Sequence, residues 1–134
     1  METIRISQFL PKDYPMIKSW WDVTDEPCAP LEFFPETTYI ASIDGIPAVS
    51  AILIVSNTPI CWMTAPIGNP EFKGKTRKEA FKTLLSFMES EAKKLGKTIM
   101  FTMNSKEGLI NRFMELGFKK THNDMTFFAK RVGE

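Results

Sequence analysis

A basic turn that leads into an amphipathic helix is the stretch of this sequence best suited to chemistry. Residues 70–80 read PEFKGKTRKEA and carry four cations, Lys73, Lys75, Arg77 and Lys78. The first amides of a helix have no partner within the helix, and the helix dipole makes that end positive. Open amides and nearby cations together bind anions, so the turn predicts a phosphate site.

Composition limits the kind of protein that can carry this site. The chain has 134 residues, of which 43% are hydrophobic and 25% charged, which is typical of one globular domain that buries its own core. We therefore expect a single domain over residues 1–134. A formal net charge of +1 gives no general attraction to nucleic acid or to an anionic membrane, so we expect neither partner. Anion binding must come from local clustering of charge.

Cysteine and histidine usage argues against a metal site. Cys28 and Cys61 lie far apart without metal-ligand spacing, and the only histidine, His122, sits in a polar stretch that reads as a solvated turn. Two lone thiols suit a reducing compartment, so we expect a cytoplasmic protein. The N-terminal residues lack the pattern of a signal peptide, and no apolar run approaches the ~20 residues of a membrane span. We expect a soluble, unprocessed protein.

The first part of the chain predicts a strand, a helix and a loop. Alternating apolar residues indicate a strand at residues 3–9, and helical spacing after Pro11 indicates a short helix through Trp20-Trp21. The segment from Asp22 to Glu36 contains three prolines and five acids with no basic residue. It predicts a structured acidic loop that is packed by its own aromatic residues.

Three consecutive strands are expected next. Residues 37–43 and 47–55 are rich in β-branched residues and flank Asp44-Gly45, a dipeptide that favours a tight hairpin turn. Residues 60–67 give a third strand. The three strands predict an antiparallel meander that ends just before the basic turn.

The helix after the basic turn is the plainest element in the sequence. Its apolar residues from Phe81 to Leu95 fall on one helical face, whereas its charged residues fall elsewhere. Gly96 follows as a stop signal, and residues 98–103 predict a further strand. The basic turn is therefore expected between a strand and a long helix.

The last part of the chain predicts one more helix and two strands. Asn104 and Glu107 offer a capping box for a helix that ends at Gly117, and strands are expected at residues 118–121 and 125–132. The complete order is β-α-loop-β-β-β-α-β-α-β-β. It predicts an α/β protein with one mixed α+β sheet and helices on both faces.

The element order and two motifs resemble the GNAT family, the acetyl-CoA-dependent N-acetyltransferases. Residues 70–80 resemble the family's acetyl-CoA signature, in which a proline leads into an Arg/Gln-x-x-Gly-x-Gly/Ala loop and the long helix. Residues 109–118, LINRFMELGF, resemble its second motif, a helix that usually ends in Tyr-x-x-x-Gly-Phe. Trp20-Trp21 and Asn69-Pro70-Glu71 also resemble a subgroup of short GNAT-like proteins found in phages and prophages.

The resemblance implies a site for acetyl-CoA or CoA. In the family the fourth strand separates from the fifth, pantetheine lies in the gap like a further strand, and loop amides bind the pyrophosphate. Carried over by position, Ile67, Gly68 and Asn69 would pair with pantetheine. The phosphates would be held by the basic turn, at Lys73, Gly74, Lys75, Thr76, Arg77 and Lys78. The implied acceptor is a primary amine on a small molecule or a peptide.

Two arrangements of the turn stay open. Thr76 and Lys78 occupy the positions of the family's two glycines, where the missing side chain lets the backbone approach a phosphate. Thr76 and Glu79 can instead form a capping box that satisfies the same amides. The sequence therefore allows either a phosphate site or a self-capped helix.

The catalytic residues stay unknown. Acetyl transfer to an amine needs a base and an acid, which the family commonly takes from a glutamate on the fourth strand and the tyrosine of the second motif. Here residues 60–67 contain no carboxylate, and Phe113 stands at the tyrosine position. Cys61, Thr64 and Glu71 are the nearby alternatives, and each also reads as an ordinary structural residue.

Two functions follow. The first is acetyl transfer from acetyl-CoA to a primary amine, for which the acidic loop would favour a cationic acceptor. The second is a GNAT-shaped module that has lost its chemistry and serves a binding or structural role, for instance in a phage particle. The sequence specifies neither the acceptor nor the oligomeric state.

Overall fold

The computed structural model describes residues 3–104, 107–121 and 128–133, which belong to two compact units. The larger unit, Met1–Met103, contains the sheet and two α-helices. The smaller unit, Asn104–Glu134, contains one α-helix. The features that bear on function lie in the larger unit.

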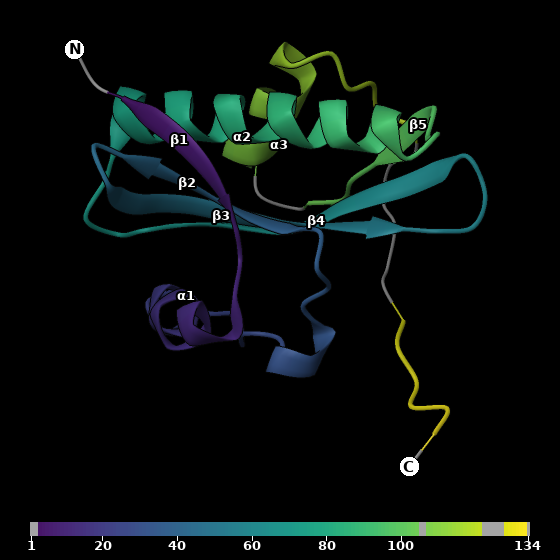
Figure 1. Ribbon diagram of the computed structural model, residues 1–134, viewed down its shortest axis with the longest axis horizontal. Helices are drawn as coiled ribbons and strands as arrows, with labels where there is room; N and C mark the ends of the chain where they lie inside the picture. The colour runs from purple at the N-terminus through teal and green to yellow at the C-terminus, as the bar shows by residue number, and fades with distance from the viewer. Residues whose placement is uncertain (1–2, 105–106, 122–127, 134) are drawn as a thin grey trace. The chain divides into compact units, whose positions relative to one another are not determined.

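A five-stranded mixed sheet forms the centre of the larger unit (Figure 1). The strands lie side by side in chain order and comprise β1 Ile4–Gln8, β2 Thr38–Ile43, β3 Ile46–Val55, β4 Ile60–Gly68 and β5 Ile99–Phe101. Neighbours from β1 to β4 are antiparallel, whereas β5 is parallel to β4. The predicted meander is thus confirmed as β2, β3 and β4.

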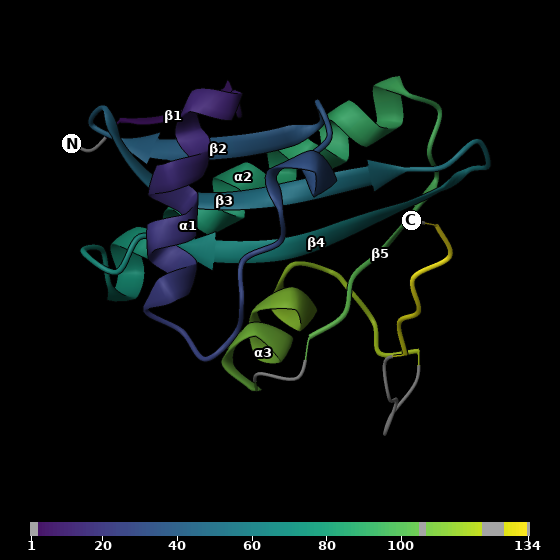
Figure 2. The ribbon, with the colours of Figure 1, turned by 90° about the horizontal axis from the view of Figure 1, so that it is seen from below.

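Helices cover both faces of this sheet (Figures 1 and 2). The long helix α2, Gly74–Lys94, lies on one face. The other face carries α1, Tyr14–Asp22, together with the short 3-10 helices η1, Pro11–Asp13, and η2, Leu31–Phe33. The predicted class, a mixed sheet with helices on both faces, is confirmed for this unit.

The hydrophobic pattern of the sequence accounts for both layers. The face of α2 that was predicted to be apolar is buried at Phe81, Leu84, Leu85 and Met88. On the opposite side, a core cluster joins α1 to the sheet through Phe9, Ile17, Trp20, Trp21 and Ile40. Each large apolar side chain buried in this way contributes about 1.5–3 kcal/mol to folding.

The expected hairpin turn and the expected acidic loop both form in the larger unit. Asp44 and Gly45 have φ angles of 50° and 85° in the β2–β3 hairpin, the left-handed values that a tight turn requires. The acidic loop is packed by its aromatic residues, because the ring of Phe34 lies 4.9 Å from that of Phe9 and 5.6 Å from that of Tyr14. This loop therefore has a defined path beneath the sheet.

The smaller unit departs from the prediction. Its helix α3, Glu107–Glu115, matches the expected helix, and Phe113 is buried with its ring 5.5 Å from that of Phe118. The predicted capping box includes Ser105 and Lys106, which lie outside the described residues. Residues 118–121 and 128–133 form no strand, so the predicted final pair of strands is wrong over its described part. The rest of that pair, with His122, lies outside the described residues.

Candidate functional site

Strand β4 is much longer than its pairing with β5. It has 9 residues, yet only Ile60–Trp62 pair with Ile99–Phe101. From Met63 to Gly68 no described strand lies next to β4 on the side of β5. This length of β4 is an open edge, and it matches the separation of strands that the resemblance implies.

A β-bulge marks the start of the open edge. Thr64 lies opposite Ile52 and Ile67 lies opposite Ser50, so two residues of β4 face a single residue of β3. One of the two, Ala65, has a φ angle of 53°, a left-handed value that is uncommon for a residue with a side chain. Bulges bend a strand and interrupt its regular pairing, so the regular ladder between β3 and β4 is interrupted at this point.

The backbone of Gly68 points towards the open edge. The amide of the next residue, Asn69, donates to the carbonyl of Ala48 on β3 at 2.7 Å. Successive residues of a strand direct their amide and carbonyl groups to opposite sides. Gly68 therefore directs its own groups away from β3, where a ligand can pair with them.

Asn69, by contrast, is occupied by the protein. Its side-chain amide donates to the carbonyl of Pro47 at 2.8 Å, and its side-chain oxygen accepts from the amide of Glu71 at 3.0 Å. Its backbone carbonyl accepts from the amide of Phe72 at 3.0 Å. Asn69 is also buried. Its polar groups therefore build the turn between β4 and α2.

The first turn of α2 is not closed by its own side chains. The helix begins at Gly74, and the cap residue Lys73 makes no side-chain hydrogen bond to the turn. Thr76 is the third residue of the helix, so the alternative in which Thr76 and Glu79 form a capping box is not the one that the structure adopts. Gly74 itself has a φ angle of 65°, a left-handed value that glycine tolerates at little cost. Among the described residues, no side-chain cap therefore occupies the amides of the first turn.

The cations of the turn differ in exposure. Lys73, Lys75 and Lys78 are exposed, whereas Arg77 is half-buried. Arg77 lies against the backbone of Gly68 at the end of β4. The structure thus brings the predicted phosphate residues and the predicted pantetheine residues to adjoining positions, the end of β4 and the start of α2.

None of the candidate catalytic side chains on β4 is suited to acid or base catalysis. Cys61 is fully buried, and its thiol donates to the carbonyl of Ile99 at 3.6 Å. Burial raises the pKa of this thiol, so it stays protonated at neutral pH. Thr64 is half-buried and has no acidic or basic group, and Glu71 is exposed beyond the end of the strand.

Thr102 is a residue that the sequence did not single out. It follows directly after β5, where that strand ends its pairing with β4. Its hydroxyl oxygen is buried without a hydrogen-bond partner among the described residues. Buried hydroxyls are normally bonded, so this one is a candidate ligand contact. Nothing in the local sequence signals it, because a threonine after a strand is common.

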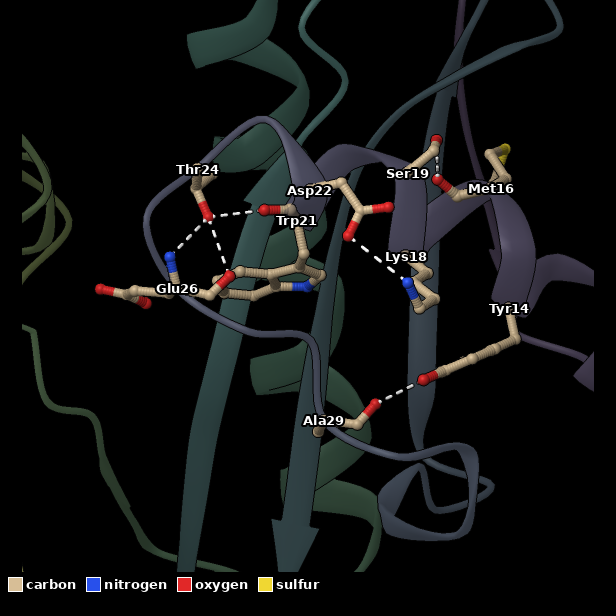
Figure 3. A network of polar contacts seen from close by, with 9 residues as sticks. All are labelled: Tyr14, Met16, Lys18, Ser19, Trp21, Asp22, Thr24, Glu26 and Ala29. Carbon is tan, nitrogen blue, oxygen red and sulfur yellow. Dashed lines mark hydrogen bonds and ion pairs between the residues drawn. The ribbon is translucent and has the colours of Figure 1, made fainter.

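The acidic loop on the other face is held by its own polar contacts (Figure 3). The hydroxyl of Thr24 donates to the carbonyl of Trp21 at 2.8 Å and accepts from the amide of Glu26 at 3.1 Å. The phenol of Tyr14 donates to the carbonyl of Ala29 at 2.9 Å. Burial, followed by a hydrogen bond with Cys28, raises the pKa of that phenol and keeps it protonated.

One acid of this loop pairs with a basic residue that lies outside the loop. Asp22 pairs with Lys18 of α1 at 3.4 Å. The remaining acids, Asp25, Glu26, Glu32 and Glu36, are exposed. The loop therefore keeps a negative surface, weaker than its five acids suggest.

The described residues contain no group of three or more His, Cys, Asp or Glu side chains placed to hold a metal ion. Within the same part of the chain, no helix is both long and apolar enough to cross a membrane. A scan against protein-family models and a search of curated proteins give no match.

Solved structures do match the chain in fold. N-acetylglutamate synthase from Neisseria gonorrhoeae, complexed with coenzyme A and L-arginine, superimposes with a TM-score of 0.73 at 19% identity over 89% of this chain. The chain spans only 28% of that protein. The ribosomal-protein-S18-alanine N-acetyltransferase from Escherichia coli matches with a TM-score of 0.73 at 18% identity, over 90% of this chain and 80% of its own.

One solved structure is matched over nearly its whole length. AAC(6')-Iy, in complex with the bisubstrate analogue CoA-S-monomethyl-acetylneamine, has a TM-score of 0.70 and 18% identity, over 97% of this chain and 99% of its own. At these identities the likeness establishes the fold. The chain has the GNAT fold of the N-acetyltransferases.

Proposed function

We propose that this chain is an acetyl-CoA-dependent N-acetyltransferase that moves an acetyl group to a primary amine. The observation that carries the proposal is the junction of two unsatisfied backbone regions in a GNAT fold. The open edge of β4 from Met63 to Gly68 leads into the uncapped basic turn at the start of α2. CoA matches both, because its pantetheine amides can extend a strand edge and its phosphates suit a helix N-terminus.

The proposal assigns separate roles to the predicted site residues. Ile67 and Gly68 form the part of β4 that lies alongside pantetheine, with the backbone groups of Gly68 directed to it. Asn69 fixes the turn through its internal hydrogen bonds. The pyrophosphate lies against the first turn of α2, held by the cations and amides of Lys73, Gly74, Lys75, Thr76, Arg77 and Lys78.

The reaction would depend mainly on the positioning of the two substrates. The amine nitrogen attacks the thioester carbon, the carbon–sulfur bond breaks, the amine loses a proton and the thiolate of CoA gains one. The buried thiol of Cys61 cannot take up the proton, since it is already protonated. With no acid or base identified among the described residues of β4, water would carry both protons, and the rate would lack the 10²–10⁴-fold that a placed acid or base typically adds. Orientation of the substrates along β4 supplies the remaining acceleration.

The acceptor class, domain organisation and compartment are part of the same proposal. The exposed acids of the loop between α1 and β2 favour a cationic amine, on a small molecule or a peptide. Both units would act as one domain, because the match to AAC(6')-Iy extends over 97% of the chain. A reducing compartment such as the cytoplasm suits the free thiols Cys28 and Cys61.

Isothermal titration with acetyl-CoA tests the proposal. We expect saturable binding with a Kd well below about 1 mM, which corresponds to a binding free energy stronger than about −4 kcal/mol. Lys93→Ala, which removes an exposed cation at the far end of α2, is the matched control and should bind like the wild type. Absence of binding at about 1 mM acetyl-CoA would exclude the function.

A second candidate, a GNAT-shaped binding module without chemistry, is favoured by one specific observation. The two family positions for an acid and a base hold no ionisable group, since β4 has no carboxylate and Phe113 is a buried phenylalanine. Such a module would bind CoA and release no thiol when given polyamines, aminoglycosides or peptide amines. Thiol release above the uncatalysed rate with any of these acceptors decides for the enzyme.

A further inference from the structure

The hydroxyl of Thr102 is a buried polar group whose hydrogen bond the protein does not supply. Among the described residues, it is the only buried side-chain oxygen or nitrogen atom without a partner. Such a group has lost its bonds to water and gained none in return, so native proteins keep few of them. Thr102 as a whole is only half-buried, so part of the residue borders solvent. The missing partner is therefore within reach of a ligand.

Thr102 stands at the point where β4 and β5 separate. The last residues of the two strands that pair are Trp62 and Phe101. The residues that follow them, Met63 and Thr102, do not pair, and β4 continues to Gly68 without a neighbour on this side among the described strands. Thr102 therefore lies at the closed end of the gap beside β4, and the basic turn lies at the other end.

The length of the gap indicates which part of CoA would reach Thr102. The strand from Met63 to Gly68 spans about 17 Å, at a rise of ~3.3 Å per residue. The arm of CoA between its phosphates and its sulfur has the backbone length of about four extended residues, or about 14 Å. With the phosphates at the start of α2, the arm ends near the closed end of the gap. Its sulfur is then the atom nearest to Thr102.

We propose that Thr102 is a catalytic residue, whose hydroxyl donates a hydrogen bond to the sulfur of CoA as the thioester breaks. This inference rests on the proposed function, because the sulfur belongs to that cofactor. The amine nitrogen bonds the acetyl carbon, the electron pair of the carbon–sulfur bond passes to sulfur, and the Thr102 hydroxyl bonds the thiolate that results. Thr102 keeps its proton, because an alkoxide is far more basic than a thiolate. Water supplies the proton that the thiolate finally gains.

The hydroxyl can make this bond without losing another. Its oxygen has no partner among the described residues, so a rotation about χ1 that turns it towards the gap breaks no hydrogen bond. A hydrogen bond to a charged acceptor is roughly twice as strong as one between neutral groups. The bond would therefore strengthen as charge grows on sulfur, which lowers the barrier. Phe113, at the family position of the proton donor, has no group that could take this role.

Isothermal titration with CoA and with desulfo-CoA, in which hydrogen replaces the thiol group, tests the contact. Thr102→Val keeps the shape of the side chain and removes the hydroxyl, so it should weaken CoA binding about 5-fold, the usual effect of losing one neutral hydrogen bond. Its affinity for desulfo-CoA should stay within about 2-fold of the wild type. Thr102→Ser keeps the hydroxyl and should bind CoA like the wild type. Thr98→Val, the same substitution at an exposed residue just before β5, is the matched control.

Two further measurements follow the thiolate itself. A hydrogen bond that favours the thiolate lowers the pKa of the bound thiol, so this pKa should rise by about one unit in Thr102→Val. The ultraviolet absorbance of the thiolate during a pH titration of the CoA complex measures it. With a primary amine that the wild type acetylates, kcat should fall about 10- to 100-fold in Thr102→Val and recover in Thr102→Ser. A purely structural role of Thr102 would leave the pKa of the bound thiol unchanged.

The outcomes separate this inference from the proposed function. Wild-type protein that binds CoA with no effect of Thr102→Val contradicts the role of Thr102 and leaves the function standing. An equal loss for CoA and desulfo-CoA also contradicts it, because the hydroxyl then contacts another part of the molecule. A loss for CoA alone, without turnover of any amine, supports the contact and contradicts the function. Absence of CoA binding by the wild type contradicts both.

A comparison within the wild type covers the case in which Thr102→Val fails to fold, as judged by circular dichroism. The wild type should then bind CoA about 5-fold more tightly than desulfo-CoA, because only CoA offers the sulfur. Equal affinities for the two probes would overturn the role of Thr102.

Discussion

The polar groups around α1 and those at the start of α2 differ in whether they have hydrogen-bond partners within the protein. Beneath the sheet, the hydroxyls of Tyr14 and Thr24 have partners within the protein, and Lys18 has an acidic partner. At the end of β4, the side chain of Arg77 has no hydrogen-bond or ion-pair partner among the described residues. The side chain of Lys73 likewise leaves the first turn of α2 uncapped. Groups that are satisfied internally hold the fold, whereas groups left open at one edge are available to a ligand.

The largest expected effect tests the first half of this comparison. Trp20 is 4% exposed in the core cluster beneath the sheet, so Trp20→Ala should lower the free energy of unfolding by about 3–5 kcal/mol. Urea denaturation measures this loss. The cluster also packs against Ala65 and Ile67 of β4, but the contacts proposed for CoA are backbone groups, so the fraction that stays folded should bind CoA with unchanged affinity. A fall in the intrinsic affinity of that fraction would show that the two regions are coupled.

A change in the basic turn should have the reverse pattern. Lys73→Ala should weaken CoA binding about 3- to 10-fold, with a larger effect at low salt, because an exposed cation acts through a screened charge. Its unfolding midpoint should match that of the wild type. Lys93→Ala, at the far end of the same helix, is the control. Equal affinities of the two variants would remove the cations of the turn from the site.

Thr102→Val probes the buried hydroxyl after β5. The substitution keeps the shape of the side chain and removes an unsatisfied polar group, so it should raise the free energy of unfolding by about 1 kcal/mol. If the hydroxyl also bonds the ligand, CoA affinity falls in the same variant. Thermal unfolding with and without CoA separates the two effects, and a loss of stability in the free protein would contradict this account of Thr102.

The smallest expected effect is a pH dependence from Cys61. Burial raises the pKa of its thiol above the ordinary 9.0, so the folded protein keeps this proton when the unfolded chain has lost it. The stabilising contribution is complete below 9.0 and is lost as the pH rises above it.

The free energy of unfolding should therefore fall between about pH 8 and about pH 10, and the slope should be shallower in Cys61→Ala. Cys28→Ala is the control with the second thiol. The raised pKa values of Tyr14 and Tyr39 act in the same direction above 10.0, so both tyrosines contribute to the slope that remains in Cys61→Ala. An unchanged slope in Cys61→Ala would contradict the assignment.

The sequence predicted those parts of the fold that depend on periodicity and on turn chemistry. The apolar face of α2 and the Asp44-Gly45 hairpin were recognisable because burial and positive φ each leave a residue pattern. The start of α2 was not recognisable, because Thr76 and Glu79 fit a capping box as well as the basic residues fit a phosphate site. The left-handed φ angle of Gly74, at the first residue of the helix, has no signal beyond the glycine itself.

The details of the site depended on contacts between distant residues. The bulge at Ala65 breaks the rule that a left-handed residue is glycine, so no residue type marked it. The internal bonds of Asn69 to Pro47 and the contact of Arg77 with Gly68 join segments that only the folded sheet brings together. Residue types therefore indicated where an anion could bind, and the structure defined which groups there lack a partner among the described residues.

Backbone amide chemical shifts, recorded by NMR during titration with acetyl-CoA, test the central claim most directly. The account predicts large shifts at Gly68 and at the first-turn amides Gly74, Lys75 and Thr76. It predicts little change in α1, Tyr14–Asp22, where the polar groups already have partners. Binding that shifts α1 and leaves Gly68 and the first turn of α2 unchanged would contradict it.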